Sequence, residues 1–146
     1  FMLLISLIDI YFNIMNIKSS KELVDEANEL IKVMSPEQVK NAYDKGEITL
    51  IDVRDIRELW KEGTIKNAMH IPRGMLEFWL DPQSSYYQEK KIGDVKNIVL
   101  FCALGFRSAL ATKSLKEMGF DNVANANGGF DSLKKAGLPV VPKERK

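Results

Sequence analysis

From Ser19 onward, segments whose apolar residues recur at helical spacing alternate with short apolar runs that have the length of buried strands. The runs that we predict to be strands are residues 48–53, 68–71, 97–102 and 123–126. We predict a helix that is capped by Ser19 and reaches Ile31, and further helices over residues 36–45, 56–62, 106–118 and 130–136. Residues 73–87 are expected to form a short helix and a surface loop.

This alternation indicates the fold class. Strands that are connected through helices form βαβ crossovers, which place the strands parallel in one sheet and the helices on both of its faces. The run 48–53 is apolar on both faces, which is typical of a central strand in a parallel sheet. The sequence therefore predicts an α/β domain with a central parallel sheet and helices on both faces.

The first seventeen residues differ from this pattern. They hold thirteen apolar residues, no basic residue and one acid, Asp9. A membrane span needs about 20 residues with few polar interruptions, and a signal peptide begins with a positive region. We therefore favour an apolar extension foreign to the domain over residues 1–18, with the domain and its N-terminal helix over 19–146. A membrane anchor, or a helix that packs on the domain or on a second copy, remains open, as does whether residues 1–14 are native.

Length, charge and cysteine content narrow the function classes. The 146 residues suit one domain of ordinary size. The 21 basic residues balance 20 acidic ones, which argues against a nucleic-acid partner. The single cysteine, Cys102, forms no internal disulfide, and with His70 as the lone histidine it builds no multi-cysteine metal site. We expect a cytoplasmic protein, monomeric or homodimeric, whose cysteine is either inert or reactive.

The position of Cys102 favours reactivity. It ends a buried strand, and a helix is predicted to begin at Phe106, so the thiol lies at the carboxyl edge of the sheet, where ligands bind in such folds. We expect its side chain to face a cleft rather than the core. Loop amides and the helix N-terminus attract anions there, Gly105 lets the backbone bend, and Arg107 adds a permanent cation. These features favour a thiolate nucleophile.

Four separated blocks of the chain resemble, in order and at workable spacing, the rhodanese-like domain family. The resemblance covers residues 35–142. The blocks are Leu50-Ile51-Asp52-Val53-Arg54 with Glu58, Gly63-Thr64-Ile65 through Ala68-Met69-His70-Ile71-Pro72, Cys102 to Arg107 followed by Ser108-Ala109, and Asn127-Gly128-Gly129-Phe130 leading to Ala136-Gly137-Leu138-Pro139-Val140.

The resemblance implies a rhodanese-like three-layer α/β sandwich and a sulfurtransferase that works through a persulfide on Cys102. It implies a small-molecule or protein donor, thiosulfate or a persulfide, and a thiophilic acceptor such as a thiol or cyanide. It implies no metal and no organic cofactor. The residues that would form the anion-binding loop around the donor are Ala103, Leu104, Gly105, Phe106 and Arg107.

Three positions depart from the usual pattern of the family. Thr64 stands where the family often has histidine, and Leu133 where it often has tryptophan; we interpret both as structural. Ala103 stands where sulfurtransferase loops often carry a basic residue directly after the cysteine. Because Ala103 and Leu104 leave the loop less cationic and more apolar, we expect dianionic thiosulfate to be a poorer donor than a persulfide.

Residues outside the loop are candidates for supporting roles. Asp52 could bind a loop amide, but we favour a carboxylate that ties down turn amides and Arg54. Arg54 and Glu58 have the spacing of a helical ion pair. His70 is available as a base, although thiolate chemistry in a cationic loop does not need one.

Further residues are expected to flank the predicted site. Arg73 and Trp79, together with Phe78, either line its entrance or pack on the surface. The pair Gly128-Gly129 is expected to allow close backbone approach beside the active loop.

Two other functions are kept as alternatives. Phosphatase-like and arsenate-reducing relatives of the family have a loop with five residues between cysteine and arginine, whereas four residues separate Cys102 from Arg107. The shorter loop suits a sulfur atom better than a tetrahedral phosphate. A non-catalytic interaction module is the other alternative, and the joint presence of Cys102, Gly105 and Arg107 disfavours it.

Overall fold

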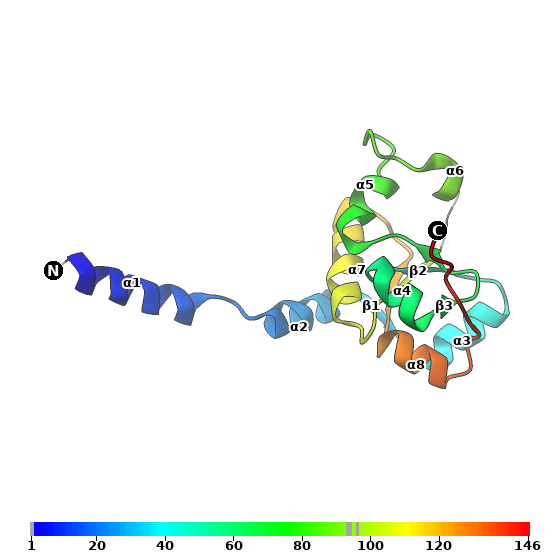
Figure 1. The fold of residues 1–146 in the computed structure, drawn as a ribbon, viewed down its shortest axis with the longest axis horizontal. Helices are drawn as coiled ribbons and strands as arrows, with labels where there is room; N and C mark the ends of the chain where they lie inside the picture. The colour runs from blue at the N-terminus through cyan, green and yellow to red at the C-terminus, as the bar shows by residue number, and fades with distance from the viewer. Residues whose placement is uncertain (1, 93–94, 96) are drawn as a thin grey trace.

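A five-stranded parallel sheet forms the centre of the computed structural model, which describes residues 2–92, 95 and 97–146 (Figure 1). The strands follow the order β1-β6-β5-β2-β4, and every neighbouring pair is parallel. This arrangement confirms the predicted α/β class. The strands are β1 (Lys32–Met34), β2 (Thr49–Asp52), β4 (Met69–His70), β5 (Ile98–Phe101) and β6 (Val123–Ala126).

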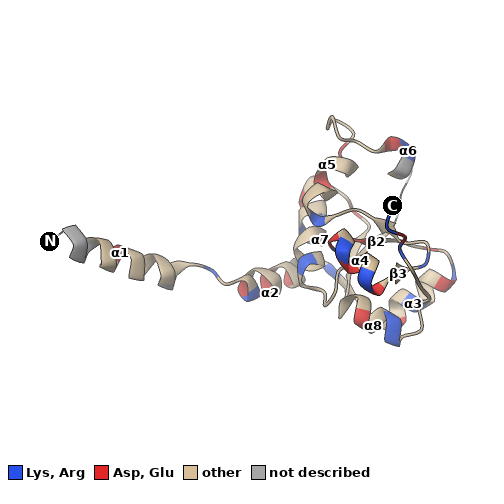
Figure 2. Ribbon diagram, in the orientation of Figure 1, with Lys and Arg blue, Asp and Glu red and all other residues tan. Residues whose placement is uncertain are grey.

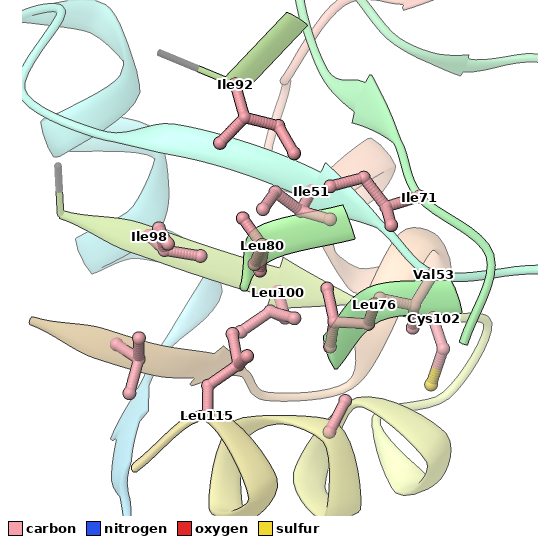
Figure 3. Close-up of a cluster of buried hydrophobic side chains, with 12 residues drawn as sticks. Ile51, Val53, Ile71, Leu76, Leu80, Ile92, Ile98, Leu100, Cys102 and Leu115 are labelled. Atoms are coloured by element: carbon pink, nitrogen blue, oxygen red, sulfur yellow. The ribbon is translucent and has the colours of Figure 1, made fainter. Parts of the chain in front are cut away.

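Helices cover both faces of the sheet, which makes the three layers that the sequence predicts. One face packs under α7 (Phe106–Met118), the 3-10 turn η1 (Arg73–Met75), α5 (Leu76–Leu80) and α6 (Glu89–Ile92). The other face packs under α3 (Pro36–Asp44) and α8 (Gly129–Lys135). Each face has its own apolar cluster, and Figure 3 shows the cluster on the α7 side.

Several local signals place these elements as expected. The Ser35 hydroxyl accepts a hydrogen bond from the Gln38 amide, the Gln38 side chain accepts one from the Ser35 amide, and Pro36 occupies the first turn, so α3 begins where its capping box predicts. Helix α4 (Ile56–Glu62) begins at a similar box formed by Asp55 and Glu58. The predicted strand 97–102 is one residue too long at each end, since β5 begins at Ile98 and ends at Phe101.

Three strands were not predicted. β1 has only three residues, and two of them are exposed because the strand lies at the edge of the sheet. β3 (Thr64–Ile65) and β7 (Val140–Val141) form a separate antiparallel pair in which Ile65 lies opposite Val140. Two-residue strands carry no readable periodicity, so only the folded chain reveals them.

The N-terminal part of the chain contains two helices with different surroundings. In α2 (Ser20–Leu30), Val24 and Ala27 are buried against Ala109 of α7. In contrast, α1 (Met2–Asn16) extends away from the body of the molecule, and the side chains of residues 6–14 are all exposed (Figure 1). The sequence of α1 contains no Lys or Arg, and the part of the helix that is coloured in Figure 2 shows none. No helix in the described part of the chain is both long enough and apolar enough to span a membrane.

Candidate active site

Cys102 lies at the carboxyl edge of the sheet, directly after β5. The segments that follow β2, β5 and β6 meet there: the Val53 amide donates to the Phe101 carbonyl at 3.0 Å, and the Phe130 amide donates to the Cys102 carbonyl at 2.8 Å. The thiol is therefore held between two neighbouring loops and the start of α7. This is the location that the sequence predicts for a reactive cysteine.

The side chain of Cys102 is more enclosed than expected. Only 1% of the residue is exposed, and it lies at one end of the apolar cluster under α7 (Figure 3). The prediction that it faces an open cleft is therefore wrong for this conformation. The cause is the tight loop, which folds back so that the amides of Gly105 and Ser108 lie 3.2 Å and 3.4 Å from the sulfur.

These polar contacts change the acidity of the thiol. Burial, the largest single influence, raises the pKa of Cys102, because it disfavours the charged form. Hydrogen bonds from the Ser108 side chain and from loop amides act in the opposite direction and together outweigh burial. The pKa of Cys102 is therefore lowered, and the thiolate is favoured in the manner expected of a nucleophile.

A buried network of polar side chains supports the groups that contact the Cys102 sulfur. The Ser108 hydroxyl lies 3.3 Å from the Cys102 sulfur and donates to Oδ1 of Asn125 at 2.6 Å. The Asn125 Nδ2 donates to the Gly105 carbonyl at 3.2 Å and to Oδ1 of Asn28 at 3.4 Å. Because a carbonyl only accepts hydrogen bonds, the Gly105 contact fixes which way the Asn125 amide faces.

Ser108 and Asn125 were not among the residues predicted to form the site. A signal for Asn125 existed, because an amide side chain inside the buried strand β6 needs a hydrogen-bonding partner. Asn28 had no such signal, because it lies on α2, far away in the sequence.

The loop also depends on close backbone packing. Gly105 has φ of +101°, a conformation that side chains disfavour. A Cβ added at Gly129 would lie 2.6 Å from the carbonyl oxygens of Cys102 and Ala103. This contact agrees with the close backbone approach predicted for Gly128-Gly129. At the outer rim, Leu104 and Phe106 are 55% and 59% exposed, so the loop presents two apolar side chains on its rim.

Arg107 pairs with a carboxylate from another element. Its two terminal nitrogens donate to the two carboxylate oxygens of Glu58 at 2.8 Å and 3.0 Å, which is a bidentate geometry. The hydrogen bond from Arg107 lowers the pKa of Glu58. Burial raises this pKa and offsets the effect only in part, so the pKa of Glu58 lies below its ordinary value. The predicted pairing of Glu58 with Arg54 is wrong, because Arg54 turns into the interior instead.

Arg54 and Asp52 form a fully buried ion pair. The Arg54 Nη2 lies 2.8 Å from the Asp52 carboxylate and also donates to the Gly63 carbonyl at 2.8 Å. Thr64 donates its hydroxyl to Asp52 at 2.8 Å, and the guanidinium lies 4.1 Å from the centre of the Phe130 ring. These contacts agree with the structural role favoured for Asp52, since it also accepts the Arg54 amide.

The remaining candidates have contacts of their own. Nε2 of His70 lies 2.7 Å from the Arg54 carbonyl, so this nitrogen carries a proton. Arg73 pairs with Glu77 at 2.9 Å, and Glu77 also accepts the Ser114 hydroxyl of α7. Trp79 packs against the apolar cluster that contains Cys102. Among the described residues, no group of three His, Cys, Asp or Glu side chains could hold a metal ion.

Residues 35–136 match the family model of the rhodanese-like domain. Among curated proteins, a sulfurtransferase of Allochromatium vinosum is 27% identical over 101 residues, which cover 69% of this chain and 85% of that protein. A tRNA uridine(34) hydroxylase of Photorhabdus laumondii is 31% identical over 111 residues, and the match covers 73% of this chain but only 30% of the hydroxylase.

Two solved structures resemble a larger share of the chain. A Rhodopseudomonas palustris protein of unknown function, described as a possible tyrosine phosphatase, has a TM-score of 0.78 at 38% identity and covers 85% of this chain and 95% of its own. The polysulfide-sulfur transferase homodimer of Wolinella succinogenes has a TM-score of 0.63 at 34% identity, covering 86% and 88%. Both matches are wider than the stretch that the family model covers.

Proposed function

The chain belongs to the rhodanese-like domain family, and on that premise we propose that it is a sulfurtransferase that carries sulfane sulfur as a persulfide on Cys102. One observation carries the proposal. The enclosed sulfur receives hydrogen bonds from the Gly105 and Ser108 amides, which stabilise a negative charge on that atom. The same donors would stabilise a persulfide. Relatives that are named sulfurtransferases support this function.

The proposed reaction consists of two displacements. The Cys102 thiolate attacks the outer sulfur of the donor, a new S–S bond forms, and the bond between that sulfur and the rest of the donor breaks. The leaving group takes the electron pair, as sulfite from thiosulfate or as a thiolate from a persulfide. An acceptor such as a thiolate or cyanide then attacks the outer sulfur and releases the Cys102 thiolate, so ping-pong kinetics are expected.

For the donor, we propose a persulfide or polysulfide rather than thiosulfate. The first residue after the cysteine is Ala103 instead of a base, and the exposed rim residues Leu104 and Phe106 are apolar. A chain of sulfur atoms is itself apolar and suits such a rim. The Wolinella relative, which is named for polysulfide-sulfur, supports this choice. Equal kcat/KM values for thiosulfate and for the best persulfide would contradict it.

The mass of the intact protein tests the sulfurtransferase function. After incubation with cysteine persulfide or thiosulfate, we expect the protein to gain one sulfur atom, about 32 Da, and to lose it when cyanide is added. The Cys102→Ser variant should gain nothing. A protein that takes up sulfur from no donor and also hydrolyses no p-nitrophenyl phosphate would be an interaction module instead.

A phosphatase is the second candidate, because the Rhodopseudomonas relative is described as a possible tyrosine phosphatase. The spacing from Cys102 to Arg107 disfavours it, since the four-residue loop leaves less room for a phosphate. Cys102-dependent hydrolysis of p-nitrophenyl phosphate, with no uptake of sulfur, would favour this candidate. The cytoplasmic location and the choice between monomer and homodimer stay predictions.

A further inference from the structure

Glu58 and Arg107 form an ion pair at the mouth of the Cys102 loop. Glu58 comes from α4 and Arg107 from the first turn of α7, 49 residues later, and both side chains are partly exposed, at 29% and 43%. The two hydrogen bonds between them, at 2.8 Å and 3.0 Å, occupy both terminal nitrogens of the guanidinium. Arg107 also interacts with the Cys102 sulfur, which adds to the rise in the pKa of Arg107 that Glu58 chiefly causes.

Two further ion pairs lie within six residues of Glu58 in the chain. Asp55 forms an ion pair with Arg57 at 2.8 Å, and Asp52 and Arg54 form a fully buried pair. Arg107 is the one arginine of the loop from residue 102 to 107, and no lysine accompanies it. Glu58 therefore offsets the single side-chain cation beside the reactive sulfur.

We propose that Glu58 is a positioning residue that selects sulfur donors by charge, favouring monoanionic donors over dianionic ones. The inference rests on the proposed sulfurtransferase function. With the thiolate, Arg107 and Glu58 together, the mouth carries a formal charge of −1, and without Glu58 it carries none. A donor with two negative charges gains more from removal of Glu58 than a donor with one, because the repulsion is proportional to the donor's charge.

Two donors that differ by one charge separate this effect from general binding. Thiosulfate is a dianion, and methanethiosulfonate is the monoanion in which a methyl group replaces one oxygen. Cys102–S⁻ attacks the terminal sulfur of either compound and forms Cys102–S–S⁻, while the old S–S bond breaks with its electron pair on the leaving group. That group is sulfite in the first case and methanesulfinate in the second, so atoms and charge balance.

The test compares kcat/KM for the two donors in the full chain and in Glu58→Gln. Glutamine keeps an oxygen that can accept the Asp55 amide in the cap of α4, so the helix start is preserved. We expect the thiosulfate-to-methanethiosulfonate ratio to rise about tenfold, the size of one additional charge interaction several ångströms away near a protein surface. Glu117→Gln is the matched control, because it removes the same charge about 15 Å along α7.

A double variant identifies the route of the effect. If Glu58 acts through Arg107, Glu58→Gln should raise the ratio much less when it is introduced into Arg107→Gln than when it is introduced into the unmodified protein, since no cation remains to be released. If Glu58→Gln turned over both donors with the same thiosulfate-to-methanethiosulfonate ratio as the unmodified protein, the inference would be wrong but the proposed function would stand. Glu58 would then act only as part of the helix cap. Failure of both donors to load sulfur onto Cys102 in the unmodified protein, when cysteine persulfide does load it, would overturn the inference, and failure of all three donors would overturn the proposed function as well.

Discussion

At the scale of single residues, the state of Cys102 depends on one shared proton. Ser108 has a single hydroxyl hydrogen, and both the Cys102 sulfur and the Asn125 oxygen lie within its reach. When the sulfur is a thiol, its own proton can bond to the Ser108 oxygen while the hydroxyl donates to Asn125. When the sulfur is a thiolate, the hydroxyl can turn to it instead. Ser108 thus stabilises the charged form, and competition with Asn125 limits the gain.

Removal of this hydroxyl should raise the pKa of Cys102. Because the pKa of Cys102 is lowered from its ordinary value of 9.0, the rate of alkylation by iodoacetamide should reach half its plateau below pH 9.0. In Ser108→Ala the midpoint should move upward by about half a unit to one unit, since one shared hydrogen bond to the thiolate is lost. At neutral pH the variant should therefore react more slowly.

Ser114→Ala is the matched control for this measurement. Ser114 lies on the same helix, and its hydroxyl bonds Glu77 rather than the cysteine loop. Its alkylation midpoint should equal that of the unmodified protein. A midpoint that stays in place in Ser108→Ala as well would mean that the backbone amides alone set the acidity of the thiol.

At the scale of elements, the start of α8 supports the active loop through direct backbone contact. Gly129 has φ of +63°, and a Cβ there would meet backbone atoms of the Cys102–Ala103 segment at 2.6 Å. Gly46 has a similar φ of +68° with no atom within 4 Å of the added carbon. A side chain at either glycine would therefore have the same unfavourable backbone conformation. Only at Gly129 would it also collide with the backbone of the cysteine loop.

The pair Gly129→Ala and Gly46→Ala separates these costs. Gly46→Ala should lower the free energy of unfolding by about 1 kcal/mol, the cost of a left-handed alanine. Gly129→Ala should lower it by about 3 kcal/mol or more, because the loop backbone must move, and should also slow alkylation of Cys102. Urea denaturation measures the first effect and iodoacetamide the second. Equal losses in the two variants would show that the loop yields freely to the added methyl group.

The elements also show how far the sequence can predict this fold. Caps and apolar runs are local, so α3, β2 and β5 were placed within a residue or two of their observed bounds. Partners from distant parts of the chain were not found: Glu58 has the spacing to pair with Arg54, yet it bonds Arg107 because α4 and α7 meet at the loop. The apolar run before Cys102 predicted that this residue lies at the end of a strand. Its burial could not be predicted, because it depends on how the loop after the strand folds back.

At the scale of the whole molecule, the question is where the domain begins. The family model starts at residue 35, which would leave α2 outside the domain. In the structure, α2 packs on α7, the helix whose first turn holds Arg107 and Ser108, and its Asn28 contacts Asn125 of the cysteine network. The Rhodopseudomonas and Wolinella matches also extend beyond residues 35–136. We therefore expect the functional unit to begin near residue 19, as the sequence predicts.

Two truncations test this boundary. A chain that begins at Lys18 keeps the Ser19 cap and loses only α1, whose side chains from residue 6 to 14 are exposed, so its free energy of unfolding should match that of the full chain. A chain that begins at Lys32 uncovers Ala109 and discards the buried Val24 and Ala27, which should cost about 3 kcal/mol. It should also react more slowly at Cys102, because Asn125 loses a partner. If the shorter chain were as stable and as reactive as the longer one, α2 would be an accessory helix and the domain would begin at β1.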